Sequence, residues 1–271
     1  MSDTGNPRGG TLPGGLTLRA LVPNAITAAA LCVGLTGIRF AIGLEFEKAI
    51  QAIIFAGMLD GIDGRIARLL KAQSRFGAEL DSLADAISFG VAPALIVYLW
   101  SLQHLPRFGW LAALAFAICC VLRLARYNAR IDIIDEPRKL AGFLTGVPAP
   151  VGAGLAFLPM YLWIVLGYEQ FRDPRLVGVW LLLMAFLLIS NVATLSWGKL
   201  RPRKSIRLEL IALAGLIVAA LLTEPWWTLV AICVLYLGMI PVGIVAYMRV
   251  RRRRSLQAAT PTMPSDDAAS G

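Results

Sequence analysis

Residues 60–68 read DGIDGRIAR, and Gly77, Asp81 and Asp85 follow at short, regular intervals. The complete pattern is D-x-x-D-G-x-x-A-R-x8-G-x3-D-x3-D, which places four aspartates within 26 positions. The chain on either side of this pattern is mostly apolar. The fold must therefore bring a dense group of acidic side chains into apolar surroundings, and that requirement limits both the structure and the function.

The overall composition indicates a membrane protein. Of the 271 residues, 58% are hydrophobic, and the mean hydropathy is +0.69. A transmembrane helix needs about 20 apolar residues. Eight stretches meet or approach that length, at roughly 22–43, 48–71, 77–101, 109–130, 148–168, 175–197, 207–223 and 225–248. We therefore predict an all-α polytopic transmembrane helix bundle of about eight spans; the last two, separated by Glu224-Pro225, have a merged or re-entrant pair as their alternative.

The basic residues predict the orientation. Of the 26 Lys and Arg residues, 21 fall in the amino-terminal lead, in the alternate connections 65–75, 123–139 and 199–207, or in the final segment 249–254. Because cytoplasmic loops are enriched in Lys and Arg, we expect both termini and the aspartates on the cytoplasmic side of the cell (plasma) membrane. The net charge of +9 then reflects topology, and bases spread over five segments predict no nucleic-acid partner.

The two ends of the chain differ in composition from its middle. The first 20 residues contain five Gly and two Pro, and residues 255–271 are rich in Ala, Ser, Pro and Asp. Such segments bury too little apolar surface to fold alone. We expect a flexible cytoplasmic segment at 1–20, a membrane-embedded domain at 21–254 and a disordered cytoplasmic tail at 255–271.

Helix geometry predicts that the aspartates meet. Asp60 and Asp63 fall on one face of the second predicted helix, and Asp81 and Asp85 on one face of the third, since residues three and four apart are neighbours on a helix. The connector 72–76 is short, so the two helices should be antiparallel neighbours. The two pairs are then expected to face each other just inside the cytoplasmic boundary.

Four acidic groups at this depth need compensation. Each costs about 2.5–3.5 kcal/mol near the bilayer centre and less toward the interface. Arg65 and Arg68 would neutralise at most two, whereas two Mg²⁺ or Mn²⁺ ions, which prefer carboxylate oxygens, would neutralise all four. Two metal ions about 3.5–4 Å apart are also the usual apparatus for displacement at phosphorus. The pattern thus favours two divalent ions as cofactors.

The alternatives are a structural ion-pair cluster and an intramembrane acidic ion-transport site, since intramembrane acids also occur along ion pathways. Neither gives a reason for the small residues that accompany the aspartates. In an enzyme they would open a groove in which a nucleotide approaches the backbone closely. These small residues are Gly61, Gly64, Ala67 and Gly77.

The complete motif resembles that of the CDP-alcohol phosphatidyltransferases, integral membrane enzymes of phospholipid synthesis. The resemblance implies a six-helix core, to which this chain would add two C-terminal spans. It implies that an alcohol attacks the phosphorus attached to diacylglycerol and that CMP leaves. In that reading Asp60, Asp63 and Asp81 bind metal, and Asp85 is the catalytic general base and a further metal contact. The implied CDP-lipid-binding residues are Gly61, Gly64, Ala67, Arg68 and Gly77, with Arg68 on the diphosphate.

Three further segments resemble the serine-using branch of this family. They are SFGVAPA at 88–94, RLARYN at 123–128 and FLTGVPAP at 143–150. The resemblance implies CDP-diacylglycerol and L-serine as substrates, phosphatidylserine and CMP as products, and a homodimer among membrane lipids. The motif alone defines only the donor, so glycerol 3-phosphate, inositol phosphate and choline remain alternative acceptors.

Serine carries a carboxylate, so its site should offer a guanidinium close to the metal ions. Arg123 and Arg126, at i and i+3 near the cytoplasmic end of the fourth predicted span, are the candidates, with Asn128 assisting. Their alternative role is positive-inside anchoring. Choline would call for an aromatic cage, and a phosphorylated acceptor for a denser basic cluster, for which residues 138–139 are available.

Overall fold

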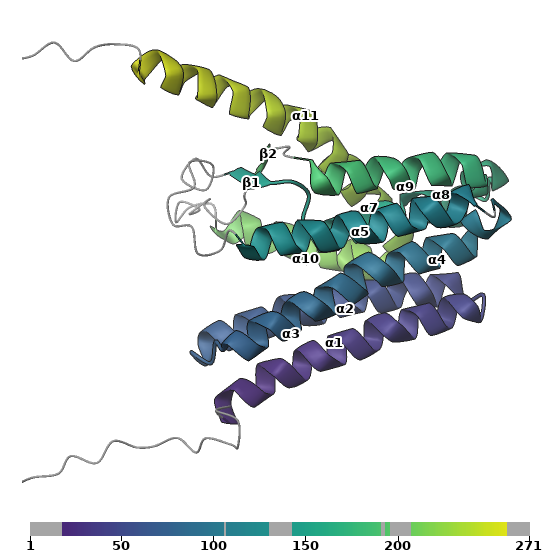
Figure 1. Ribbon diagram of the computed structural model, residues 1–271, viewed down its shortest axis with the longest axis horizontal. Coiled ribbons are helices and arrows are strands. Elements are labelled where there is room, and N and C mark those ends of the chain that lie inside the picture. Colours follow the sequence, from purple (N-terminus) through teal and green to yellow (C-terminus); the bar gives the residue numbers. More distant parts are fainter. Residues whose placement is uncertain (1–17, 106, 130–142, 191–192, 196–206, 259–271) are drawn as a thin grey trace, which may run out of the picture.

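The computed structural model describes residues 18–105, 107–129, 143–190, 193–195 and 207–258. Its helices run side by side along one direction (Figure 1). The elements in chain order are α1 (Leu18–Ile42), α2 (Phe46–Leu69), α3 (Arg75–Asp85), the π-helical turn η1 (Ala86–Val91), α4 (Ala92–Trp100), η2 (Leu102–His104), α5 (Phe108–Ala129), β1 (Phe143–Thr145), α7 (Ala149–Ala156), α8 (Leu158–Leu166), η3 (Glu169–Arg172), α9 (Pro174–Ile189), β2 (Ala193–Leu195), α10 (Arg207–Thr223) and α11 (Pro225–Ala258).

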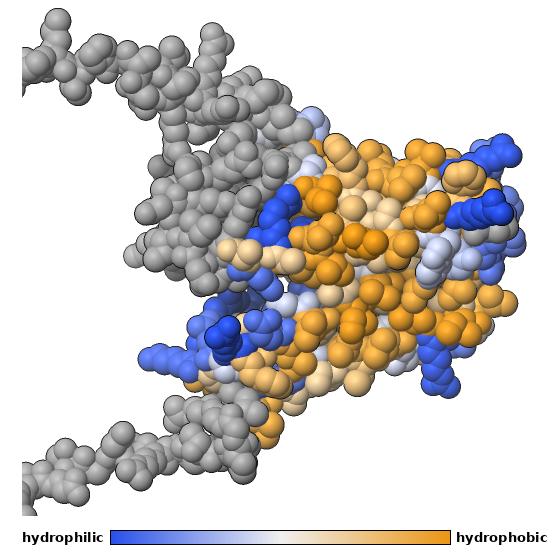
Figure 2. Space-filling model, in the orientation of Figure 1, coloured by the Kyte–Doolittle hydropathy of each residue, from blue (hydrophilic) through white to orange (hydrophobic). Residues whose placement is uncertain are grey.

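The helices confirm a polytopic membrane bundle. Four are long and apolar enough to cross a membrane, namely Leu21–Ile42, Arg75–Trp100, Phe108–Ala129 and Ala149–Leu166, and Pro174–Ile189, Ala212–Thr223 and Pro225–Pro241 are shorter apolar helices. α2 carries the charged motif on its last turns, which lowers its mean hydropathy. Figure 2 shows a broad apolar belt with hydrophilic residues toward both ends, as expected of a surface that faces lipid.

Both described ends of the chain lie at one end of the bundle. The start of α1 and the end of α11 are on the left in Figure 1, where α2 ends, α3 begins and β1 pairs with β2. We call this the motif end, and we call the other the opposite end.

Small residues allow the helices to pack closely. α1 lies along α2, and a Cβ built on Gly37 would stand 3.1 Å from the Ala49 carbonyl oxygen. A Cβ on Gly34 would stand 2.5 Å from Ser88 Oγ in η1. Helices in membranes associate largely through such close van der Waals contact. The core further in is formed by large buried side chains, among them Trp100 and Phe116.

The third predicted span is interrupted by the π-helical turn η1. The Ala92 amide donates to the Ile87 carbonyl five residues earlier, and Pro93 follows directly. Proline has no amide hydrogen, and its ring clashes with the carbonyl four residues before it. The wider turn accommodates that ring, and such π-turns recur at functional sites. It begins immediately after Asp85, so it determines the direction in which the side chains after Asp85 point.

Two helix ends differ from the sequence prediction, and a short strand pair was not predicted. The sixth span ends at Ile189 and not at 197, because Ser190 is extended and β2 then pairs antiparallel with β1, Phe143 opposite Leu195. This short ladder is a small departure from an all-α fold. α11 runs to Ala258, beyond the expected end of the eighth span at 248 and into the expected tail. Arg, Leu, Gln and Ala form helices readily, so the helix continues through them.

Candidate active site

The aspartates of the motif converge at the motif end of the bundle. Carboxylate oxygens of Asp60 and Asp63 on α2 and of Asp81 on α3 all lie within 4.8 Å of one another. Asp63 is buried, whereas Asp60 and Asp81 are partly exposed. The ion pair found among the described residues, Lys48–Glu45, lies at the opposite end of the bundle and does not involve these aspartates. Three hard oxygen donors without a basic partner there match the coordination preference of Mg²⁺ and Mn²⁺.

Asp85 lies beside this group and is not one of its three members. It ends α3, one turn after Asp81, and its side chain approaches that of Asp60. The side chains of Asp81 and Asp85 both come close to that of Asp60. The structure brings together all four predicted carboxylates, with Asp85 in a position distinct from the other three.

The surface of α2 is open at the glycines expected to lie against the donor. A Cβ built on Gly61 or on Gly64 meets no heavy atom within 4 Å, and both residues are exposed. Ala67 is partly exposed and Arg68 is exposed on the last turn of α2. Gly77 differs, because a Cβ there would lie 2.8 Å from Asn24 Oδ1 of α1. A side chain at 77 would therefore require the Asn24 side chain of α1 to move.

The three acceptor candidates on α5 have different surroundings. Arg123 lies near Asp85, and its Nε is buried without a hydrogen-bond partner among the described residues. Arg126 Nη1 donates to the carbonyl oxygen of Ile189, the last residue of α9, at 2.7 Å. Asn128 Nδ2 donates to Ser82 Oγ of α3 at 2.7 Å. Arg123 therefore lies near Asp85, whereas Arg126 and Asn128 connect helices.

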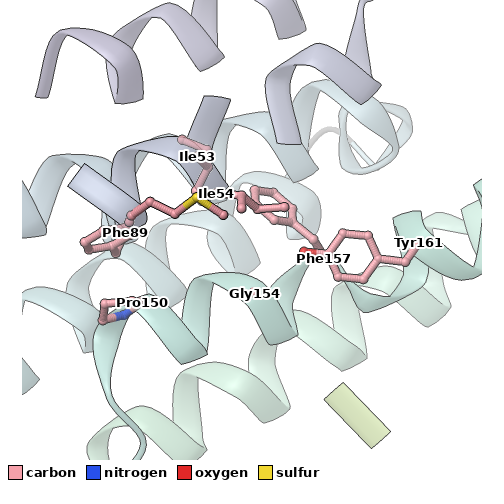
Figure 3. Close-up of a pocket in the computed structure, with 9 residues that line it drawn as sticks. Ile53, Ile54, Phe89, Pro150, Gly154, Phe157 and Tyr161 are labelled. Carbon is pink, nitrogen blue, oxygen red and sulfur yellow. The ribbon is translucent and has the colours of Figure 1, made fainter. Parts of the chain in front are cut away.

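An apolar cavity lies between α2, η1, α7 and α8, with a volume of about 240 Å³. Figure 3 shows Phe89 and Pro150 at one side of it and Phe157 and Tyr161 at the other. Gly57, also in its wall, is three residues before Asp60, and Phe89 is four residues after Asp85. The cavity thus begins about one helical turn further from the motif end than the carboxylates. It was not predicted from the sequence, because its walls come from distant segments.

Comparison with known proteins agrees with this geometry. The family model of CDP-alcohol phosphatidyltransferase matches residues 20–196, and the model described as CDP-alcohol phosphatidyltransferase 2 matches residues 205–241.

The chain belongs to the CDP-alcohol phosphatidyltransferase family. Relatives named CDP-diacylglycerol–serine O-phosphatidyltransferase include those of Mycobacterium tuberculosis H37Rv, Mycobacterium leprae and Helicobacter pylori 26695. The first is 37% identical over 240 residues, which cover 89% of this chain and 82% of the relative. The second is 37% identical over 224 residues (83% and 74%), and the third is 33% identical over 181 residues (67% and 74%).

Members of the CDP-alcohol phosphatidyltransferase family generally use a divalent metal, and the aspartate cluster could bind one.

Two residues of α1 that the sequence analysis did not single out also belong to the site. Thr27 Oγ1 lies 2.6 Å from Asp63 Oδ2, and Asn24 packs against Gly77. The signal was the segment VPNAIT at 22–27, a polar interruption at the start of an apolar span. No local pattern in it indicates that Thr27 reaches a residue 36 positions later.

Proposed function

We propose that this protein transfers the phosphatidyl group of CDP-diacylglycerol to the hydroxyl of L-serine, giving phosphatidylserine and CMP. The observation that carries the proposal is the convergence of three carboxylates from α2 and α3 within 4.8 Å, with the surface of α2 open at Gly61 and Gly64. Family membership supports the donor and the reaction type. The relatives' names support serine as the acceptor.

Asp60, Asp63 and Asp81 would hold the divalent ions, two of them, as Mg²⁺ or Mn²⁺, with Asp85 as a further contact for one of them. Their chemistry when bound would be neutralisation of the diphosphate and stabilisation of the leaving CMP. Asp63, on α2, is contacted by Thr27 of α1, and Asp81 lies on α3. The carboxylates are therefore held on separate helices of the bundle. Rigid helical placement of this kind suits a metal centre.

The donor would lie along α2. Gly61 and Gly64 leave room for the cytidine diphosphate to approach the helix backbone, with Ala67 and Gly77 as further parts of its site. Arg68, one turn after Gly64, would form charge-assisted hydrogen bonds with the diphosphate.

The apolar cavity one turn further from the motif end suits hydrocarbon, so we assign it to part of an acyl chain of the donor. A Cβ on Gly154 meets no atom within 4 Å, so Gly154→Val should reduce that space and selectively raise the KM for long-chain donors.

The acceptor would lie between Asp85 and α5. Asp85 would take the proton of the serine hydroxyl as its oxygen bonds to phosphorus, while the bond from phosphorus to the CMP oxygen breaks. Arg123 is near Asp85 and has an unpartnered Nε within the described structure, so it would bind the serine carboxylate. Arg126 and Asn128 would act mainly by holding α5 against α9 and α3.

The membrane setting completes the proposal. Arg65, Arg68, Arg123 and Arg126 all lie near the motif end, so by the positive-inside rule that end faces the cytoplasm. Both termini and the site would then be cytoplasmic in the cell membrane, with the domain boundaries at residues 20 and 254. Most of 1–20 and of 255–271 lies outside the described residues. A homodimer is part of the proposal, and light scattering of the purified protein would test it.

The decisive experiment is an acceptor panel. Purified protein, CDP-diacylglycerol and Mn²⁺ are incubated with serine, glycerol 3-phosphate, inositol phosphate or choline, and CMP release is measured. Release with serine alone is the expected result. Release with another acceptor alone would change the branch of the family and leave the metal chemistry as proposed. No CMP with any acceptor, together with ion flux in proteoliposomes, would instead support the ion-transport reading.

A further inference from the structure

Thr27 connects the first helix to the aspartate cluster. Its Oγ1 lies 2.6 Å from Asp63 Oδ2 and 3.1 Å from the carbonyl oxygen of Pro23. Both side chains of the shorter contact are buried, Thr27 to 5% and Asp63 to 3% exposure. Asp63 is thus the most enclosed of the three carboxylates in the cluster, and Thr27 is a polar neighbour from another helix.

The two contacts compete for one proton. A threonine hydroxyl has a single hydrogen, and an ionised carboxylate only accepts. When Asp63 is charged, Thr27 must therefore donate to it, and the Pro23 carbonyl, although within reach, receives no hydrogen from Thr27. Thr36, on the same helix, shows the ordinary alternative, because its Oγ1 donates to the Cys32 carbonyl four residues earlier at 2.7 Å. The two threonines differ because Thr27 has the Asp63 carboxylate within hydrogen-bond distance, whereas Thr36 bonds to a carbonyl of its own helix.

α1 is positioned so that this contact is held in place. It packs along α2 and also against α3, and its Asn24 side chain fits against Gly77 at the start of α3. Asn24 and Thr27 are three residues apart and so share one face of α1. That face meets both halves of the motif, the α2 half through Thr27 and the α3 half through Asn24.

We propose that Thr27 is a positioning residue that orients the Asp63 carboxylate for the divalent cation. The hydrogen bond would satisfy one oxygen of a buried carboxylate and restrict its rotation, so the remaining lone pairs point into the cluster. Partners that orient metal ligands in this way typically contribute 10- to 100-fold to metal affinity. The inference rests on the proposed function, because it requires that the cluster binds a metal.

The test measures Mn²⁺ binding to the full-length protein in detergent, with and without CDP, by electron paramagnetic resonance of the free ion. No turnover is involved. Thr27→Ser and Thr27→Ala both lose the methyl group, and they differ only in the hydroxyl. Thr27→Val keeps the volume and loses the hydroxyl. Thr36→Ala is the matched control on the same helix, and elution profile and thermal unfolding in EDTA report folding.

We expect the Mn²⁺ dissociation constant to rise about 10- to 100-fold in Thr27→Ala and Thr27→Val. It should stay within about threefold of the wild type in Thr27→Ser and Thr36→Ala, since each keeps the Asp63 hydrogen bond. Equal affinities for the Ser and Ala variants would overturn the inference and leave the proposed function intact. If both hydroxyl-free variants fail to fold while Thr27→Ser folds, the hydroxyl serves the fold, which also contradicts the inference. A wild type that binds no Mn²⁺ under either condition would overturn both the inference and the metal centre.

Discussion

At the opposite end of the bundle Arg172 is surrounded by groups that satisfy it, whereas at the motif end the aspartates face one another. Arg172 Nε donates to the Trp100 carbonyl at 3.1 Å, and its guanidinium lies 6.0 Å and 5.6 Å from the ring centroids of Trp100 and Trp163. Its own carbonyl accepts from Ser101 Oγ at 2.7 Å. Asp60, Asp63 and Asp81 lie instead mainly against one another, and Thr27 donates a hydrogen bond to Asp63 at 2.6 Å.

The difference separates structural from functional charge. A charge that serves the fold lowers its desolvation cost through partners of the same chain, as carbonyl and aromatic contacts do for Arg172. Carboxylates that repel one another gain little for the fold, and a bound cation would offset the cost of their desolvation and repulsion. The comparison therefore predicts that substitutions at the motif end affect chemistry and that substitutions at the opposite end affect stability.

The largest expected effect is that of Asp63→Asn. The change keeps the size of the side chain and removes one of three carboxylates that lie within 4.8 Å. CMP release should be abolished, and Mn²⁺ affinity should fall by more than the roughly 10- to 100-fold typical of losing a ligand's hydrogen-bond partner. CMP release and Mn²⁺ titration on the same sample check this. Full activity of the variant, or of the wild type in EDTA, would show that the aspartate cluster does not bind a metal needed for activity.

Asp85→Asn should show a narrower defect. As a general base Asp85 would contribute about 10²–10⁴-fold to turnover, while it stands outside the group of three carboxylates. We expect kcat to fall by that factor with Mn²⁺ affinity nearly retained. A loss of Mn²⁺ affinity as large as that of Asp63→Asn would show that Asp85 is chiefly a metal ligand.

Arg123→Ala and Arg126→Ala should separate binding from packing on α5. Removing a charge-assisted hydrogen bond costs about 1.5–3 kcal/mol, so Arg123→Ala should raise the serine KM roughly 10- to 150-fold with the donor KM unchanged. Arg126→Ala removes the bond to Ile189, so it should lower the thermal midpoint and change the serine KM less.

Serine methyl ester, which lacks the free carboxylate, is the control substrate for these two variants. It should be a poor substrate for the wild type, and Arg123→Ala should discriminate less between ester and acid. An equal loss with both acceptors would assign Arg123 to the donor phosphates.

The smallest expected effect on activity is that of Arg172→Ala. Loss of its hydrogen bond and ring contacts at a half-buried site should cost about 1–2 kcal/mol, or about 2–8 °C in thermal midpoint. CMP release at 25 °C should stay within about twofold of the wild type, since Arg172 lies far from the motif. Arg175→Ala, at an exposed position of the same end, is the control and should change neither quantity. A large loss of turnover in Arg172→Ala would contradict the conclusion that charges at the opposite end serve stability and not chemistry.

Much of the fold followed from local patterns. Apolar stretches predicted the helices within a few residues, because a segment surrounded by lipid must satisfy its backbone groups internally. The misplaced ends have local and distant causes. α9 stops at Ile189 because the chain turns into a strand paired with residues some 50 positions earlier, and such pairing leaves little trace in either segment alone. The extension of α11 was missed because its basic end was read as a boundary.

The sequence by itself determined the class of protein and the chemistry of its motif. Period and spacing place Asp60 with Asp63, and Asp81 with Asp85, since residues three or four apart on a helix share a face. Only the tertiary structure decided that the three carboxylates expected to bind metal lie within 4.8 Å of one another, that Arg123 lies near Asp85, and that Thr27 reaches Asp63. These relations join side chains from different helices, and their distances depend on how those helices pack, on Gly77 against Asn24 and on the π-turn before Pro93.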